Sequence, residues 1–296
     1  MIAHCSELQH RPKQRWCVLA YAFALLWSAA SAYAAPRIAV WGAPTAVLPG
    51  LQSAQPAIDW QLEAAANDAQ LHIAWHAEAY ERALQQEQRA PMLLISSSLS
   101  RRPLKRPQDA ALLWGPPLAQ QVRLARRVMP LAKRIGVMIR KLPDQDMMLT
   151  LEREIDLLAI AMKAEGVTVV PLLMKAPMTT RAIAEAAEQV DIFVASNDEV
   201  LFNRDSAKLI LLTAYRHQRA LIGPSPAFVS AGAVATMAVP KSALLAALLA
   251  RVERWQKTGH IGESASVEAF KPVLNPQVAR SLGLFLAPDL LREAKP

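Results

Sequence analysis

The chain has 296 residues, of which 53% are hydrophobic and 20% charged, and its formal net charge is +8. This length leaves room for two domains of ordinary size, and the apolar content excludes an intrinsically disordered chain. Ten glycines and 21 prolines without a period exclude collagen-like and solenoid repeats, and the charge is too diluted to indicate nucleic-acid binding.

The first 34 residues have the pattern of an export signal. Positions 11 to 15 hold three basic residues, and an apolar run from Trp16 to Ala30 follows. The run is shorter than the roughly 20 residues that span a bilayer, and small residues at Ala32 and Ala34 mark a cleavage site. We predict a Sec-type signal peptide over 1–34 and a periplasmic protein; the alternative is an anchor that is never cut.

Cleavage would remove both cysteines, Cys5 and Cys17. A mature chain without cysteine has no disulfide scaffold, cysteine nucleophile or thiolate metal site, and it suits the oxidising periplasm. Its net charge falls to +6, because three basic residues and one acidic residue leave with the signal peptide.

The rest of the sequence alternates predicted strands with predicted helices. In the first part, short apolar runs predict strands over 37–41, 71–75, 91–96 and 111–114. Helical spacing predicts helices over 57–69 and 77–88. The first of these helices rests on Ile58, Leu62 and Ala65.

Beyond residue 118 the alternation is more regular. The clearest helix repeats apolar residues at steps of three and four, with Gly166 just past its end: Met148, Leu151, Ile155, Leu158 and Met162. We predict further helices over 118–129, 180–189, 205–217, 228–231 and 242–257. We predict strands over 135–139, 167–173, 191–195, 220–222, 234–239 and within 267–273. Asn275 as N-cap with Pro276 at the first helical position opens another helix, and a last one begins near Pro288.

This alternation predicts an α/β fold with parallel sheets and right-handed crossovers. We expect two Rossmann-like lobes: a first lobe over 35–115, completed by part of 241–260, and a second lobe over 118–240. The C-terminal 261–296 should pack back on both, and 114–117, which reads Trp-Gly-Pro-Pro, should link them. Two such lobes predict a clamshell that binds a ligand in its cleft.

Four stretches in order resemble ABC transporter substrate-binding proteins with the type I periplasmic-binding fold. They are 121–137, where a helix stops at Pro130 before Ile135-Gly136, then 191–198, 220–233 and 273–291. The resemblance implies a small-molecule ligand, an inner-membrane ABC permease or other membrane protein as partner, and a monomer. It is weaker in the first lobe, where 94–100 has no glycine at the place of the family's glycine-containing turn.

The first candidate ligand-binding residues follow predicted strands at their carboxyl ends, where open α/β sheets bind ligands. In the first lobe these are Ser96, Ser97 and Ser98; the alternative is a polar loop. In the second lobe they are Ser196, Asn197 and Asp198. Asp198 would pair with an amino group, and Asn197 would donate and accept hydrogen bonds; helix capping is the alternative.

Four more residues are candidates for the cleft wall. Phe202 and Phe228 lie shortly after second-lobe strands, as does Ser225, and Trp41 ends the first strand. For Trp41, a place in the core is an equally good explanation.

Signals for catalysis or a bound metal are missing. His72 and His76 are four residues apart, but they fall on a strand leading into a helix and complete no zinc pattern. No nucleophile elbow, Walker loop or dinucleotide-binding glycine turn follows a predicted strand. We therefore expect neither cofactor, metal nor enzyme activity. The basic loop at 101–106 should be solvated, with an anionic partner surface as the alternative.

Three functions remain, in descending order. The first is the periplasmic solute-binding component of an ABC-type importer, which captures a small organic, amino-acid-like ligand between two lobes. The second is a divergent relative that serves as a periplasmic sensor or accessory subunit of a membrane complex, without transport cargo. The third is an exported enzyme on a Rossmann-like scaffold.

Overall fold

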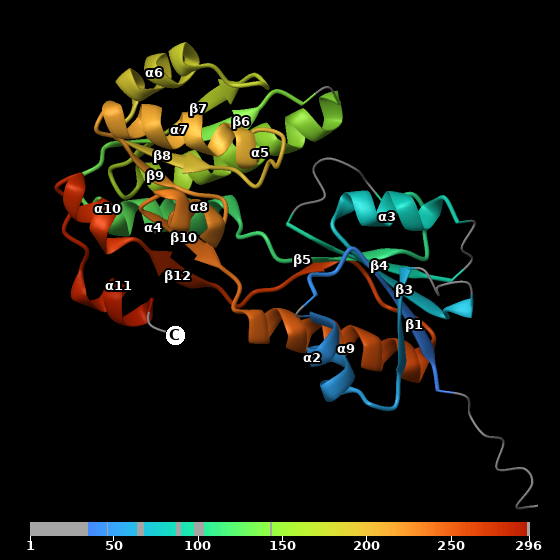
Figure 1. Ribbon diagram of the computed structural model, residues 1–296. Coiled ribbons are helices and arrows are strands. Elements are labelled where there is room, and N and C mark those ends of the chain that lie inside the picture. The colour runs from blue at the N-terminus through green and yellow to red at the C-terminus, as the bar shows by residue number, and fades with distance from the viewer. Residues whose placement is uncertain are drawn as a thin grey trace, which may run out of the picture.

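The computed structural model describes residues 35–45, 47–63, 68–86, 90–97, 104–142 and 144–294. They form two lobes, each built on a six-stranded sheet flanked by helices (Figure 1). This confirms the predicted α/β fold with two predominantly parallel sheets. The signal peptide predicted over 1–34, the candidate Ser98 and positions 101–103 of the basic loop lie outside the described residues.

The first sheet has the strand order β11-β5-β4-β3-β1-β2, and every pair in it is parallel. Its strands are β1 (Arg37–Trp41), β2 (Asp59–Leu62), β3 (Leu71–Trp75), β4 (Met92–Ser96), β5 (Ala110–Leu113) and β11 (Ala265–Ser266). Helices α2 (Val47–Ala54) and α9 (Lys241–Thr258) cover one face, and α3 (Ala77–Leu84) covers the other (Figure 1). We call this half the first lobe.

The second sheet has the order β12-β10-β9-β8-β6-β7, and only β12 runs antiparallel to its neighbour among these described strands. Its strands are β6 (Arg134–Arg140), β7 (Thr168–Met174), β8 (Ile192–Ala195), β9 (Ala220–Ile222), β10 (Ala235–Ala238) and β12 (Lys271–Leu274). One face packs on α4 (Leu118–Val128), α5 (Gln145–Lys163), α10 (Pro276–Ser281) and α11 (Pro288–Glu293). The other packs on α6 (Thr180–Gln189), α7 (Arg204–Arg216) and α8 (Pro226–Ala231). We call this half the second lobe.

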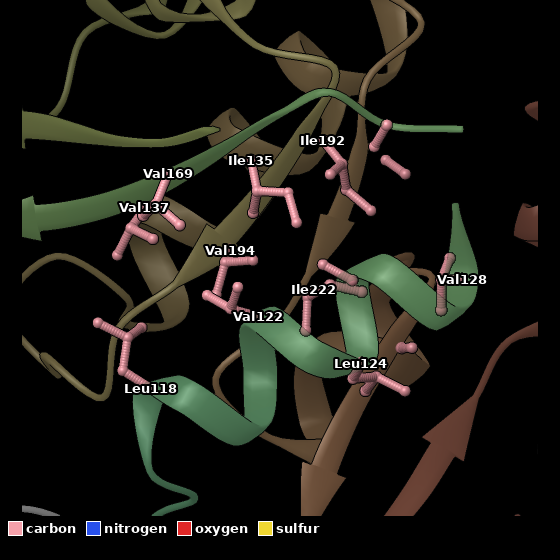
Figure 2. Close-up of a cluster of buried hydrophobic side chains, with 14 of the residues drawn as sticks. Leu118, Val122, Leu124, Val128, Ile135, Val137, Val169, Ile192, Val194 and Ile222 are labelled. Atoms are coloured by element: carbon pink, nitrogen blue, oxygen red, sulfur yellow. The ribbon is translucent and has the colours of Figure 1, made fainter. Parts of the chain in front are cut away.

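Successive side chains along the central strands of the second sheet point to opposite faces and so pack into two separate cores. In β6, Ile135, Val137 and Ile139 join one cluster of buried side chains, whereas Met138 joins the other. Figure 2 shows side chains of α4, such as Val122, gathered with those of the strands in the first cluster. Each fully buried Val, Ile or Leu side chain stabilises the fold by about 1.5–3 kcal/mol. Because both faces of the sheet are buried, its central strands are continuous apolar runs in the sequence.

Helix α5 confirms the clearest helical pattern in the sequence. Ile155, Leu158 and Met162 are buried against the sheet. The helix begins where the Asp144 side chain accepts a hydrogen bond of 2.9 Å from the Met147 amide. Gly166 follows its end with a left-handed φ of 74°, which glycine adopts without steric cost.

The helix predicted over 57–69 is wrong. Residues 59–62 form strand β2 at the edge of the first sheet, with Trp60 buried and Leu62 57% exposed. Period-two burial from Ile58 to Trp60 overrides the coincidental helical spacing of Ile58 and Leu62. The helix of this region comes earlier, as α2, where Pro49 and Gly50 obscure the pattern in the sequence.

The chain passes between the two lobes at three places in the described residues. The segments are 114–117, 239–240 and 267–270, which join strands or helices of different lobes. C-terminal residues therefore serve both halves: α9 and β11 belong to the first lobe, and β12, α10 and α11 belong to the second.

A buried carboxylate holds the first lobe together beneath the basic loop. Asp109 has a fully buried side chain. It accepts hydrogen bonds from the Tyr80 hydroxyl at 2.8 Å and the Met92 amide at 3.0 Å, and it pairs with Arg106 at 2.8 Å. Burial is the main cause that raises the pKa of Tyr80 to about 12. Arg106 is thus a structural residue of the lobe.

Replacing Asp109 tests this network. Asp109→Ala should lower the free energy of unfolding by about 3 kcal/mol, because it leaves a partly buried guanidinium, a buried hydroxyl and a buried amide without their partner. Chemical denaturation measures the change. The control Asp59→Ala removes a carboxylate whose side chain is 48% exposed and should cost less than about 1 kcal/mol. Equal losses in the two variants would contradict the account.

Candidate functional site

A cavity of about 610 Å³ lies between the two lobes. The carboxyl ends of parallel strands from both sheets point toward it: Ser97 follows β4, Leu113 ends β5, Arg140 ends β6 and Ser196 follows β8. This is the place where open α/β sheets bind ligands. The two lobes therefore meet with their functional edges facing each other.

Most of the cavity wall is apolar. Its apolar side chains come from the end of β5, the linker at 114–117, the start of α4, the segment after β6 and the first half of α5: Leu113, Pro116, Pro117, Leu118, Leu142, Met147 and Leu151. A wall of this kind favours the apolar part of a small organic molecule, with a few polar groups to fix its orientation.

Two carboxylates of α5 add negative charge to this wall. Asp146 and Glu154 both line the cavity, and neither forms an ion pair with another residue in the described part of the chain. Desolvation raises the pKa of Glu154 above its ordinary value. The site thus offers a positively charged group a carboxylate that gains by being neutralised.

Arg140 and Asp198 form a partly buried ion pair on the opposite side. Their side chains are 17% and 8% exposed, and Arg140 Nε donates to Asp198 Oδ2 at 2.8 Å. The other carboxylate oxygen accepts from the amides of Val200 and Leu201 at 2.8 and 3.1 Å. Asp198 therefore fixes the turn after β8 and joins it to the end of β6.

The hydroxyl of Ser196 is buried without a hydrogen-bond partner in the described residues. The residue itself lines the cavity. A buried hydroxyl without a partner is costly. Because this oxygen has almost no accessible surface, a ligand would reach it only after the surrounding residues move.

Two hydrogen bonds bridge the lobes at the edge of the cavity. Ser97 Oγ in the first lobe donates to Glu199 Oε1 in the second at 2.9 Å. Asn197 Nδ2 donates to the carbonyl oxygen of Pro116 in the linker at 2.8 Å. The residues that follow β4 and β8 thus meet directly.

Gly115 makes this approach possible. A Cβ at this position would lie 2.1 Å from the carbonyl oxygen of Ser97 and 2.8 Å from Asn197 Nδ2. Such contacts with backbone cannot be relieved by a side-chain rotation. The bridged arrangement of the lobes therefore requires glycine in the linker.

Gln121 lines the cavity and holds neighbouring elements together, a role that no sequence pattern indicated. Its amide nitrogen donates to the Gly223 carbonyl and to Thr236 Oγ1, both at 3.1 Å, and its oxygen accepts from the Met237 amide at 3.0 Å. Gln121 is 1% exposed. The network ties the first turn of α4 to β9 and β10, and only the tertiary contact explains a buried glutamine there.

The cavity gathers some of the residues predicted from the sequence. Ser97, Ser196, Asn197 and Asp198 line it, and Ser96 lies just behind it, 4% exposed at the end of β4. Whether they bind a ligand stays a prediction. The sequence reasoning missed Arg140 and the cavity-facing side of α5; the position of Arg140 at the end of a strand was the signal that could have found it.

The other candidates lie outside the cavity lining. Trp41 is 2% exposed, and its indole nitrogen donates to His72 Nδ1 at 3.0 Å inside the first lobe. Phe202 and Phe228 pack edge to face in the core of the second lobe, with ring centroids 6.1 Å apart. Ser225 stands at the N-cap position of α8 without a side-chain capping bond.

Solved structures share this arrangement at low sequence identity. An ABC domain in complex with L-Trp from Streptococcus pneumoniae matches with a TM-score of 0.62 and 14% identity, over 87% of this chain and 97% of its own. A ligand-free, open substrate-binding protein with adhesive properties from Clostridium difficile matches with a TM-score of 0.62 and 15% identity, over 86% and 96%.

A conserved domain protein from Vibrio cholerae matches with a TM-score of 0.64 and 15% identity, over 88% of this chain and 99% of its own. No protein-family model and no curated protein matches the chain. The likeness confirms the expected type I periplasmic-binding-protein-like fold, and with it the resemblance to substrate-binding proteins of ABC transporters at the level of the fold.

The role of Gly115 can be tested by adding one methyl group. Gly115→Ala should prevent the bridged contact and increase the radius of gyration measured by small-angle X-ray scattering. The control Gly50→Ala places its Cβ no closer than 3.9 Å to the nearest side chain and should leave the radius unchanged. An unchanged radius in Gly115→Ala would show that the lobes do not depend on this contact.

Proposed function

We propose that this protein is the periplasmic solute-binding component of an ABC-type importer and captures a small organic, amino-acid-like ligand between its lobes. The observation that carries the proposal is the cavity of about 610 Å³ between the carboxyl ends of the two sheets. Its volume lies in the range of small-molecule sites. The buried hydroxyl of Ser196 adds a polar group that has no hydrogen-bond partner among the described residues.

The chemistry of the wall favours a ligand with an apolar body and an amino group. Leucine and methionine side chains would cover the body, and Glu154 and Asp146 would attract the ammonium group. The Streptococcus pneumoniae structure holds L-Trp, a ligand of the same general kind.

The proposal extends to place and partner. The signal-like sequence of 1–34 supports export to the periplasm. The described residues include no helix long and apolar enough to cross a membrane. A closed form would dock on an inner-membrane ABC permease, and we infer a monomer, which size-exclusion chromatography with light scattering tests. The lobe boundaries are part of the same proposal: 35–115 completed by part of 241–260, then 118–240, with 261–296 packing back on the lobes.

We infer binding without turnover. The cavity lining pairs its one arginine with Asp198. Within the described residues of that lining, no serine stands beside a histidine or lysine that would activate it as a nucleophile. Substrate consumption by the purified protein would contradict this inference.

Thermal unfolding against amino acids, small amines, carboxylates and sugars tests the proposal. A ligand at 100 times its dissociation constant stabilises by about 2.7 kcal/mol, which raises the midpoint by several degrees. Ser196→Ala should weaken the response about tenfold in affinity, because the ligand loses one buried hydrogen bond. No response across the set would contradict capture of these compounds.

Glu154 gives the proposal a pH-dependent signature. A carboxylate whose folded-state pKa is raised favours the folded state at low pH and loses that advantage as the pH rises through the raised pKa. Because Glu154 is exposed and solvent screens its charge, Glu154→Gln should raise the melting temperature at pH 7 only slightly, and it should have no effect below about pH 3. The control Glu152→Gln lies on the same helix and outside the cavity lining, and it should leave the melting temperature unchanged at both pH values.

The same variant should respond to ligand in the opposite direction. Glu154→Gln removes the charge that attracts an ammonium group, so it should bind an amine ligand less tightly at pH 7 although the free protein is more stable. A variant that is both more stable and equally good at binding would remove Glu154 from the site.

A second candidate function is a sensor or accessory subunit of a membrane complex. It is favoured by exposed apolar residues on the outer face of α5, where Leu157 is 69% and Ile160 is 70% exposed, an arrangement that marks contact surfaces on soluble proteins. Cross-linking in cells with and without Leu157→Glu tests it. A ligand response from the cavity without any cross-linked partner would favour the importer component.

A further inference from the structure

A second pocket lies at the opposite end of the first sheet. It has a volume of about 1030 Å³ and is lined by residues that precede strands: Pro91 before β4, Asp109 before β5 and Ser264 before β11. The cavity between the lobes lies at the other end of these strands, where Ser97, Leu113 and Ser266 line it. The two hollows are therefore separated by the length of the first sheet.

Two arginines of α9 give the pocket its charge. Arg251 and Arg254 both line it, and the described residues supply no carboxylate within ion-pair distance of either. Arg251 Nη1 donates to the Ile261 carbonyl at 3.0 Å. Desolvation, followed by the neighbouring charge of Arg254, lowers the pKa of Arg251. Two like charges thus stand together without the anion that would stabilise them.

The backbone is shaped around these guanidinium groups. Ile261 is 2% exposed and anchors the segment after α9 in the core of the first lobe. The next residue, Gly262, has a left-handed φ of 78°. A Cβ there would lie 2.8 Å from Arg251 Nη1 and 3.3 Å from Arg254 Cζ. Glycine lets the segment pass directly over both side chains.

The acidic groups nearby do not neutralise the pair. Asp109 is satisfied by Arg106, the Tyr80 hydroxyl and the Met92 amide. Glu263 lines the pocket, but it makes no ion pair with Arg251 or Arg254. The dipole of α9 does not explain Arg251 either, because that effect fades within the last turn of a helix, and Lys257 already occupies the last turn.

We propose that this pocket binds a phosphate group, held by Arg251 and Arg254, at the end of the first lobe remote from the solute cavity. Paired guanidinium groups match the geometry of phosphate oxygens and bind them bidentately. The group would come either from a small soluble phosphate compound or from the headgroup of an anionic phospholipid. Strand β1 begins at this same end of the first sheet, at Arg37 (Figure 1).

Two binding measurements on the purified protein distinguish the sources. Calorimetry with inorganic phosphate and pyrophosphate tests the soluble compounds. Co-sedimentation with vesicles of phosphatidylglycerol and phosphatidylcholine, against phosphatidylcholine alone, tests the lipid headgroup. We expect binding in at least one arm, and the arm that responds identifies the source.

Matched variants test the site itself. Arg254→Gln should weaken the observed binding about tenfold, because Arg254 would lose its charged hydrogen bonds to phosphate. The control Lys257→Gln removes the same charge from the same helix, at a side chain that is 70% exposed and paired with Glu253, and should leave the affinity unchanged. Ser196→Ala, in the solute cavity, should also leave it unchanged.

The proposal depends on two results, binding in at least one arm and weaker binding by Arg254→Gln. The Arg254 side chain makes no hydrogen bond within the described residues, and the carbonyl oxygen of this residue accepts one from Thr258 Oγ1. Arg254→Gln therefore tests the site even if the double variant Arg251→Gln/Arg254→Gln unfolds. Absence of binding in both arms would overturn the proposal. Equal weakening by Arg254→Gln and Lys257→Gln would overturn it too, because general charge attraction would then account for the binding.

Discussion

The absence of a side chain at Gly115 is the constraint on which the functional arrangement depends. The linker passes between the ends of β4 and β8 so closely that a methyl group would overlap the Ser97 carbonyl oxygen. Because Gly115 has no side chain, the linker can pass this closely, and Ser97 hydrogen-bonds to Glu199 while Asn197 hydrogen-bonds to the Pro116 carbonyl. The two sheets then enclose a cavity, and side chains at the strand ends become its wall instead of an open surface.

Around this contact, polar side chains divide into those that hold the structure and those that remain for a ligand. Asp198 and Gln121 face the cavity, yet their hydrogen bonds go to Arg140, to backbone amides and to Thr236. They set the positions of the strand ends. Glu154, by contrast, lines the cavity without an ion pair in the described residues, and the buried Ser196 hydroxyl has no hydrogen-bond partner there. A satisfied polar network gives rigidity, and the few groups outside it give selectivity.

Much of the fold could be predicted because its signals are local. The pattern from Met148 to Met162 and the β-branched strands of the second sheet depend on burial that repeats along the chain. The interval 57–69 failed because Trp60 is buried at the sheet edge for tertiary reasons. For the site, the strand-end rule located Ser97 and Asn197. It could not find Glu154 or Gln121, whose side chains reach the cavity only through the packing of α5 and α4, nor could it tell that Phe202 turns into the core.

If a ligand binds between the two lobes, the lobes should move relative to each other when it binds. Double electron–electron resonance tests this motion directly. The spin labels are placed at two exposed positions, Gln85→Cys on the first lobe and Glu188→Cys on the second. With a ligand identified by thermal unfolding, the account predicts that the distribution of distances narrows and shifts as the lobes close. A distribution that stays the same while the ligand binds would place the site outside the cleft and contradict the account.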